Sequence, residues 1–178
     1  MSTRKALLSE FDKMESERKA IIAKMKLNAV EILDQKPAPN AWSVTEAIMH
    51  LVVAETGALK YMNKKLEYGG HQKASFSAGV KQRFLNLAVA LPFKYKAPKV
   101  AQIQEGSNIS FEDADKQWIE IRAALRDRYL GLDEAIIDHE LFKHPAAGKL
   151  SIMQSVRFMR QHMNRHIKQM NDTINQVS

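Results

Sequence analysis

Two histidines near the C-terminal end of the chain have the spacing of a metal-binding pair. His162 and His166 stand four residues apart in a segment with helical periodicity, so their side chains should share one face, about 6 Å apart. Such a pair is the simplest two-point chelate for a divalent metal ion that a helix offers. Exposed pairs with this spacing also occur by chance. Met159, Met163 and Met170 flank the pair, however, and place it at the edge of an apolar stripe that faces inward.

His50 is the candidate third ligand. Its neighbours on the same helical face, Ala47, Ala54 and Gly57, are small and leave space above the helix surface. Because empty apolar space is destabilising, the gap indicates an occupant: a metal ion, water, a ligand or a large side chain from a facing helix. The alternative is a single half-buried histidine that is hydrogen-bonded to a carbonyl group.

Three further side chains are candidates for a catalytic or supporting role. A metal ion held by three neutral imidazoles keeps open positions, where a water or a thiol loses a proton more easily, and hydrolysis also needs a general base nearby. Glu46, one turn before His50, is the nearest carboxylate in the sequence, although a helix cap is the more common role for its position. Glu55 lies on the apolar seam and could instead pair with an arginine such as Arg18. Gln169, on the same helix as the histidine pair, fits a position in the pocket or behind a ligand.

Four segments with apolar residues at helical spacing must position these side chains. They span residues 3–34, 43–68, 111–129 and 151–175. Three of them begin with the spacing of a capping box or a close variant, in which a serine hydroxyl accepts from the third helical N–H and an acid or amide reaches back. The pairs are Ser43 with Glu46, Ser110 with Asp113, and Ser151 with Gln154.

The connections between these segments suggest how the helices are arranged. Pro37 and Pro39 end the first helix and make a short connection, so the first two helices should be antiparallel neighbours. The segment 69–109, which we expect to hold a short helix around 80–87, is long enough to let the third helix lie parallel to the second. The segment 131–149 is interpreted as an irregular crossover. The remaining histidines fall in connections and are interpreted as surface or turn residues: His71, His139 and His144.

These elements predict an all-α protein. We expect a four-helix bundle with one long crossover between its second and third helices. Because neither an internal repeat nor a linker divides the chain, residues 1–178 should form a single domain.

Composition excludes several classes of function. The 178 residues include no cysteine, which excludes a disulfide framework, thiolate metal ligands and a cysteine nucleophile. No stretch approaches the roughly 20 apolar residues of a membrane span. The first residues lack a signal-peptide core, so we expect a soluble cytoplasmic protein with no membrane partner.

The net charge of +7 favours a solvated basic surface over a nucleic-acid site, because acidic residues are mixed with the basic ones. No specific nucleic-acid partner is therefore expected. Lys94, Lys96 and Lys99 form the densest basic group, and they could border a pocket and attract an anionic thiol or acid.

Three stretches resemble the DinB-like family, which includes metal-dependent hydrolases. They are residues 41–51 (AWSVTEAIMHL), 144–151 (HPAAGKLS) and 162–169 (HMNRHIKQ). The resemblance implies a four-helix bundle of up-down-down-up order. It also implies a divalent metal ion, most often nickel or zinc, held by three histidines that correspond to His50, His162 and His166.

The activities that this resemblance implies are diverse. They include hydrolysis of a small-molecule substrate and transfer or isomerisation with a low-molecular-weight thiol such as bacillithiol, mycothiol or glutathione. The alternative is a stress-related bundle protein that binds a metal or ligand without turnover. A homodimer is a further expectation, although the sequence does not choose the oligomeric state.

Overall fold

The described part of the chain is mostly helical, as expected. A computed structural model describes residues 3–73, 109–144 and 148–178. Its elements are α1 (Thr3–Met25), α2 (Val30–Asp34), α3 (Val44–Tyr68), α5 (Phe111–Leu130), a 3-10 turn (Glu134–Ile136), β1 (Glu140–His144), β2 (Gly148–Ser151) and α6 (Ile152–Val177). The short helix expected around 80–87 and the basic group Lys94, Lys96 and Lys99 lie outside the described residues.

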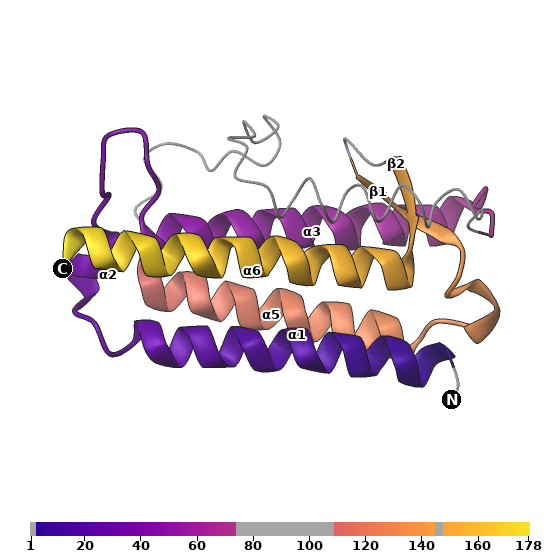
Figure 1. Ribbon diagram of the computed structural model, residues 1–178. Coiled ribbons are helices and arrows are strands. Elements are labelled where there is room, and N and C mark those ends of the chain that lie inside the picture. Colours follow the sequence, from indigo (N-terminus) through magenta and orange to yellow (C-terminus); the bar gives the residue numbers. More distant parts are fainter. Residues whose placement is uncertain (1–2, 74–108, 145–147) are drawn as a thin grey trace.

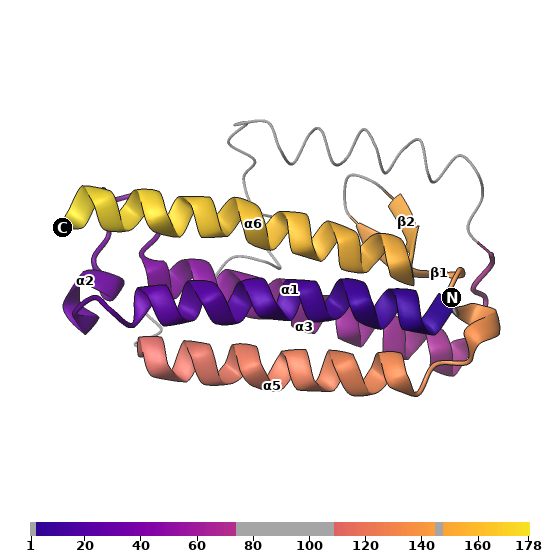
Figure 2. The same cartoon turned by 60° about the horizontal axis from the view of Figure 1, so that its bottom comes forward.

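The long helices of the described residues, α1, α3, α5 and α6, lie side by side in both ribbon views (Figures 1 and 2). α1 and α6 run in one direction, and α3 and α5 run in the other. α1 and α3 both pack against α5 and α6, so each long helix has two long neighbours. Their apolar faces form one core, which includes the fully buried side chains of Phe11, Ile48, Trp118 and Met163. In the described ranges, no helix is long and apolar enough to cross a membrane.

The predicted caps are present at the starts of α3 and α6. The backbone N–H of Glu46 donates to Ser43 Oγ at 3.1 Å, and the N–H of Ser43 donates back to the Glu46 carboxylate at 3.0 Å. Ser151 and Gln154 form the same reciprocal pair. At Ser110 the hydroxyl accepts from the third helical N–H, as predicted, but it also donates to the side chain of that residue. These bonds fix the residue at which each helix begins.

The first predicted helix is wrong in its length. It ends at Met25, and α2 follows as a separate short helix. The side-chain amide of Asn28 donates to the carbonyl oxygens of Met25 at 3.0 Å and of Lys24 at 3.4 Å. It thereby takes acceptors that the next helical turn would use, and the helix stops there.

The segment 131–149 is more ordered than predicted, because it carries a β-hairpin that continues directly into α6. β1 and β2 pair in antiparallel fashion, with a register shift between Glu140 and Phe142. Leu141 and Leu150 point into the core and are fully buried. Two short strands thus cover one end of the helical core and are a small addition to the expected all-α fold.

Candidate metal centre

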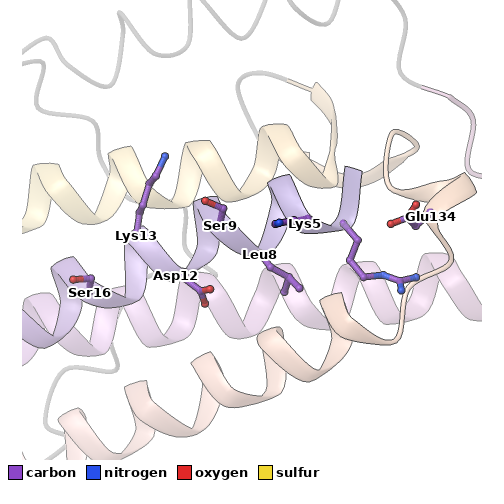
Figure 3. Close-up of a pocket in the computed structure, with 8 residues that line it drawn as sticks. Lys5, Leu8, Ser9, Asp12, Lys13, Ser16 and Glu134 are labelled. Carbon is purple, nitrogen blue, oxygen red and sulfur yellow. The ribbon is translucent and has the colours of Figure 1, made fainter. Parts of the chain in front are cut away.

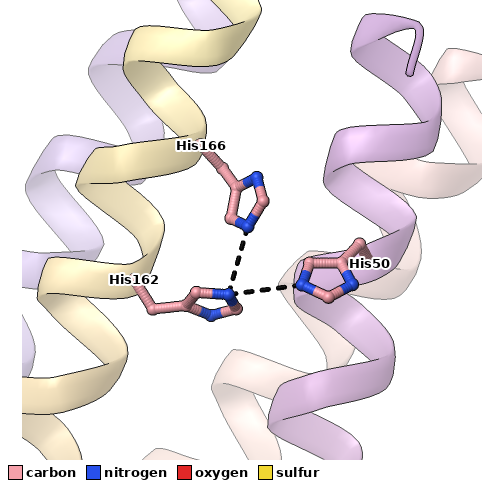
Figure 4. Close-up of side chains that lie close together, drawn as sticks. All are labelled: His50, His162 and His166. Atoms are coloured by element: carbon pink, nitrogen blue, oxygen red, sulfur yellow. Dashed lines mark hydrogen bonds between the residues drawn. The ribbon is translucent and has the colours of Figure 1, made fainter. Parts of the chain in front are cut away.

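The structure brings together the three histidines that were predicted as ligands (Figure 4). α3 and α6 are antiparallel neighbours, so the beginning of α3 lies beside the second half of α6. His50 Nε2 lies 3.2 Å from His162 Nε2, which lies 3.1 Å from His166 Nε2. One ligand atom from each residue falls within 4.8 Å of the others. His50 and His166 are buried, with 5% and 7% of their surface exposed.

The protonation state of His166 suits a metal ligand. Its Nδ1 lies 2.8 Å from Gln169 Oε1, and an amide oxygen can only accept a hydrogen bond. Nδ1 therefore carries the ring proton, which leaves a lone pair on Nε2, the atom that faces the other histidines. Burial, together with the nearby His50, lowers the pKa of His166 to about 4. The imidazole is therefore neutral near pH 7, as metal binding requires.

The convergence of three ring nitrogens suits a metal ion, because hydrogen bonds alone cannot join all three. Each nitrogen has either one proton or one lone pair in the ring plane, so an N–H···N bond can join only two of the three at a time. A cation accepts all three lone pairs at once. Ligand nitrogens around tetrahedral zinc lie roughly 3.3 Å apart, given Zn–N bonds of about 2.0–2.1 Å. The two neighbour distances, 3.1 and 3.2 Å, are close to that value, and all three ligand atoms lie within 4.8 Å of one another.

Two aromatic side chains that were not predicted as site residues border the cluster. The Trp42 ring centroid lies 4.7 Å from that of His50 and 5.8 Å from that of His166. Phe158, one turn before His162 on α6, stacks on the His162 ring at 5.8 Å. Periodicity identified neither contact, because it reports which face is apolar and not which ring lies on which. The position of Trp42 directly before the cap of α3 was the available signal.

Glu46 is held in contacts of its own. One of its carboxylate oxygens accepts from the backbone N–H of Ser43, and the other lies 2.7 Å from Lys36 Nζ. The structure thus gives Glu46 the cap role that its position favoured.

Glu55 also has partners elsewhere: it pairs with an arginine, as the alternative had it, but with Arg122 and not with Arg18. Its carboxylate forms a two-point ion pair with Arg122, at 2.6 and 2.7 Å, and accepts from the indole of Trp118 at 3.3 Å. Arg18 instead binds Glu15 and Asp115. The sequence pattern marked Glu55 as an unusual seam residue, but it did not indicate which arginine would face it.

The small residues beside His50 differ in exposure. Ala47 is buried, whereas Gly57 is exposed, and an added Cβ at Gly57 would meet no atom within 4 Å. The face of α3 that carries His50 is therefore open at its far end among the described residues.

Of the other histidines, His71 and His139 lie in connections, as expected, and form a pair, whereas His144 lies in a strand. His71 Nδ1 and His139 Nδ1 lie 2.8 Å apart, in the segment after α3 and just before β1. His144 is the last residue of β1.

A separate hollow of about 700 Å³ lies beside the first turns of α1, and Figure 3 shows the side chains that line it. It shares no residue with the histidine cluster. Its lining consists of Arg4, Lys5, Leu8, Ser9, Asp12, Lys13, Ser16 and Glu134.

Comparison with known proteins agrees with the resemblance seen in the sequence. No curated protein and no solved structure matches the chain significantly. The family model of the DinB superfamily, in contrast, matches residues 13–170, which include all three histidines of the cluster and most of the chain. The chain therefore belongs to the DinB superfamily.

Proposed function

We propose that the chain is a metal-dependent enzyme in which His50, His162 and His166 bind one divalent cation, nickel or zinc. The observation that carries the proposal is the convergence of three imidazole nitrogens, with adjacent distances of 3.2 and 3.1 Å. The bond from His166 to Gln169 supports it, because it leaves a lone pair on the nitrogen that faces the cluster. When bound, a divalent ion would act as a Lewis acid that lowers the pKa of a water or thiol in an open position.

Of the two reactions, transfer of a low-molecular-weight thiol to a small substrate is favoured by the contacts of the candidate general bases. Hydrolysis calls for a base that can take a proton from water. Glu46 and Glu55 both use their carboxylates in other bonds, the first in a cap and the second in a buried ion pair. A thiol, whose pKa of about 8.5 is already far below that of water, could release its proton to solvent beside a metal ion without such a base. The net charge of +7 would also attract an anionic thiol.

We further propose that residues 1–178 form a single domain, a four-helix bundle of up-down-down-up order with its long crossover between α3 and α5. The opposite directions of the α1, α6 pair and the α3, α5 pair support that order. A homodimer, a cytoplasmic location and the lack of a specific nucleic-acid partner stay predictions.

Metal content tests the first step of the proposal. Protein purified without chelator, or loaded with nickel or zinc, should hold about one ion per chain by elemental analysis. His162→Ala should weaken this binding at least tenfold, whereas His139→Ala, which removes a histidine outside the cluster, should leave it unchanged. A chain that takes up neither metal would refute the proposal.

Activity tests the second step. Nickel- and zinc-loaded protein should accelerate the reaction of a small thiol with an electrophilic aromatic substrate more than it accelerates the hydrolysis of an activated ester. The His162→Ala variant should lose this acceleration. Faster ester hydrolysis would favour the hydrolase, and metal binding without turnover would favour the non-catalytic alternative.

A further inference from the structure

The ring contacts of Trp42 set it apart from the aromatic residues of the core. Trp42 is half-buried, and it does not belong to the apolar cluster that the described helices share. Its ring neighbours are His50 on α3, with the planes tilted by 40°, and His166 on α6, with the planes 23° apart. One indole therefore contacts two imidazoles that come from two different helices.

The backbone around Trp42 holds the indole in place. The carbonyl oxygen of Trp42 accepts from the hydroxyl of Thr173 on α6, at 3.4 Å, and Thr173 is buried. The next residue, Ser43, is the N-cap of α3, with its N–H bonded to Glu46. The backbone at Trp42 is thus tied to α6 on one side and to the first turn of α3 on the other, and the indole lies against an imidazole from each of these helices.

We propose that Trp42 is a positioning residue for the metal centre, which packs on the imidazoles of His50 and His166 and holds their Nε2 atoms toward a common point. The inference rests on the proposed function. An imidazole can rotate about its Cβ–Cγ bond, and ordering each ring at the moment of binding costs free energy. An aromatic wall that orders both rings beforehand removes part of that cost, as hydrogen-bonding groups behind metal ligands do.

Gln169 and Trp42 therefore have complementary tasks. The bond from Gln169 fixes which nitrogen of His166 carries the proton, and it acts in the plane of that ring. Trp42 acts on the ring faces and joins the α6 histidine to the α3 histidine. His162 receives its own face contact from Phe158.

The test compares four proteins: the parent, Trp42→Ala, Trp42→Phe and Tyr61→Ala. Tyr61 is the matched control, because it is also a half-buried aromatic residue, about 16 Å further along α3 from His50. The dissociation constant for nickel is measured by competition with a chromophoric chelator. The visible absorption of the cobalt-loaded proteins reports the symmetry of the ligands. Thermal unfolding of the metal-free proteins reports stability.

Trp42→Ala should bind nickel about 10- to 100-fold more weakly than the parent and should change the cobalt spectrum. Trp42→Phe should restore most of the affinity, because a phenyl ring can still cover the imidazoles. Tyr61→Ala should keep the parent's affinity and spectrum. Equal nickel affinity for Trp42→Ala and the parent would overturn the inference. An equal loss in Trp42→Ala and Tyr61→Ala would also overturn it, because it would indicate a general loss of stability.

A measurement without metal separates this inference from the proposed function. The indole ring current should shift the imidazole proton resonances of His50 and His166 in the metal-free parent, and Trp42→Ala should remove those shifts. If the parent binds no metal, the proposed function fails, and Trp42 loses its role at a metal centre even where the shifts are present. If the parent binds metal and the shifts are absent, the inference about Trp42 fails and the proposed function stands.

Discussion

Glu55→Gln should destabilise the protein strongly and leave metal binding intact. The side chains of Glu55 and Arg122 are 3% and 2% exposed. Two hydrogen bonds of 2.6 and 2.7 Å join the Arg122 guanidinium to the Glu55 carboxylate. Glutamine has nearly the same shape as glutamate and can still accept from the indole of Trp118. The variant therefore removes one charge and keeps the packing, so that a charged guanidinium stays buried without its main partner.

The expected loss follows from the surroundings of Arg122. Breaking a buried ion pair by removing one partner costs about 3–5 kcal/mol, because the remaining charge is uncompensated. Glu15 lies 3.8 Å from Arg122 Nη1, so its carboxylate still balances part of the guanidinium charge in the variant. The loss of unfolding free energy should therefore fall near the lower end of this range, about 3 kcal/mol. For a chain of this length, each kcal/mol shifts the melting temperature by about 2–4 °C, which gives a decrease of roughly 6–12 °C.

Urea denaturation and thermal unfolding, followed by circular dichroism, measure this loss. The double variant Glu55→Gln with Arg122→Met should recover part of it, because no buried charge is left over. Lys168→Ala breaks an exposed pair with Asp172 and serves as the control, with an expected cost below about 1 kcal/mol. Unchanged stability in Glu55→Gln, together with lost turnover in the metal-loaded protein, would refute the structural role and make Glu55 a catalytic residue.

Four further predictions concern the metal centre and the surface charge. His162→Ala and His166→Ala should each weaken metal binding at least tenfold. Their helical circular dichroism should persist, because the apolar core provides most of the stability. Unfolding of the protein upon removal of the metal by a chelator would contradict that role of the core. Gln169→Leu should weaken nickel binding about 10- to 100-fold and Gln169→Glu should not, as measured by chelator competition. A histidine in the unfolded chain has a pKa of about 6.5, whereas buried His166 has a pKa of about 4, so the unfolded chain binds a proton at a higher pH than the folded protein does. The free energy of unfolding of the metal-free protein should therefore decrease by up to about 3 kcal/mol as the pH falls from about 6.5 to 4. In urea denaturation, His166→Phe should show a smaller decrease over the same pH range. Duplex DNA should bind with micromolar affinity or weaker and dissociate as salt rises; sequence-dependent binding above about 0.2 M salt would contradict the absence of a nucleic-acid site.

The histidine pair on α6 could be predicted because local rules determine it. His162 and His166 share a helical face by their spacing alone, and the methionines around them show that this face is buried. The starts of α3 and α6 follow from short-range capping patterns, and the structure has both capping boxes. Each of these signals lies within a few residues, where chain geometry leaves little freedom.

The features that the sequence did not predict depend on contacts between distant residues or on a competing local bond. Arg122, and not Arg18, faces Glu55 because of the rotation of α5 relative to α3, which periodicity does not fix. The stacking of Trp42 on His166 joins residues far apart in the chain. The end of α1 depends on one side chain, Asn28, whose amide takes carbonyl acceptors of the helix. The hairpin depends on the burial of Leu141 and Leu150 under the helices.

The cap serines and the histidine ligands lie on the same side of α3 and of α6. His50 follows the cap Ser43 by seven residues, and His162 and His166 follow the cap Ser151 by eleven and fifteen. At about 100° per residue these offsets come within roughly 20°, 20° and 60° of whole turns, so each ligand lies on the same side of its helix as the cap. Both cap serines are buried, which shows that this side faces the interior. The cap serines and the histidine ligands therefore lie on the inward side of α3 and α6, and the packing of these two helices brings the ligands together.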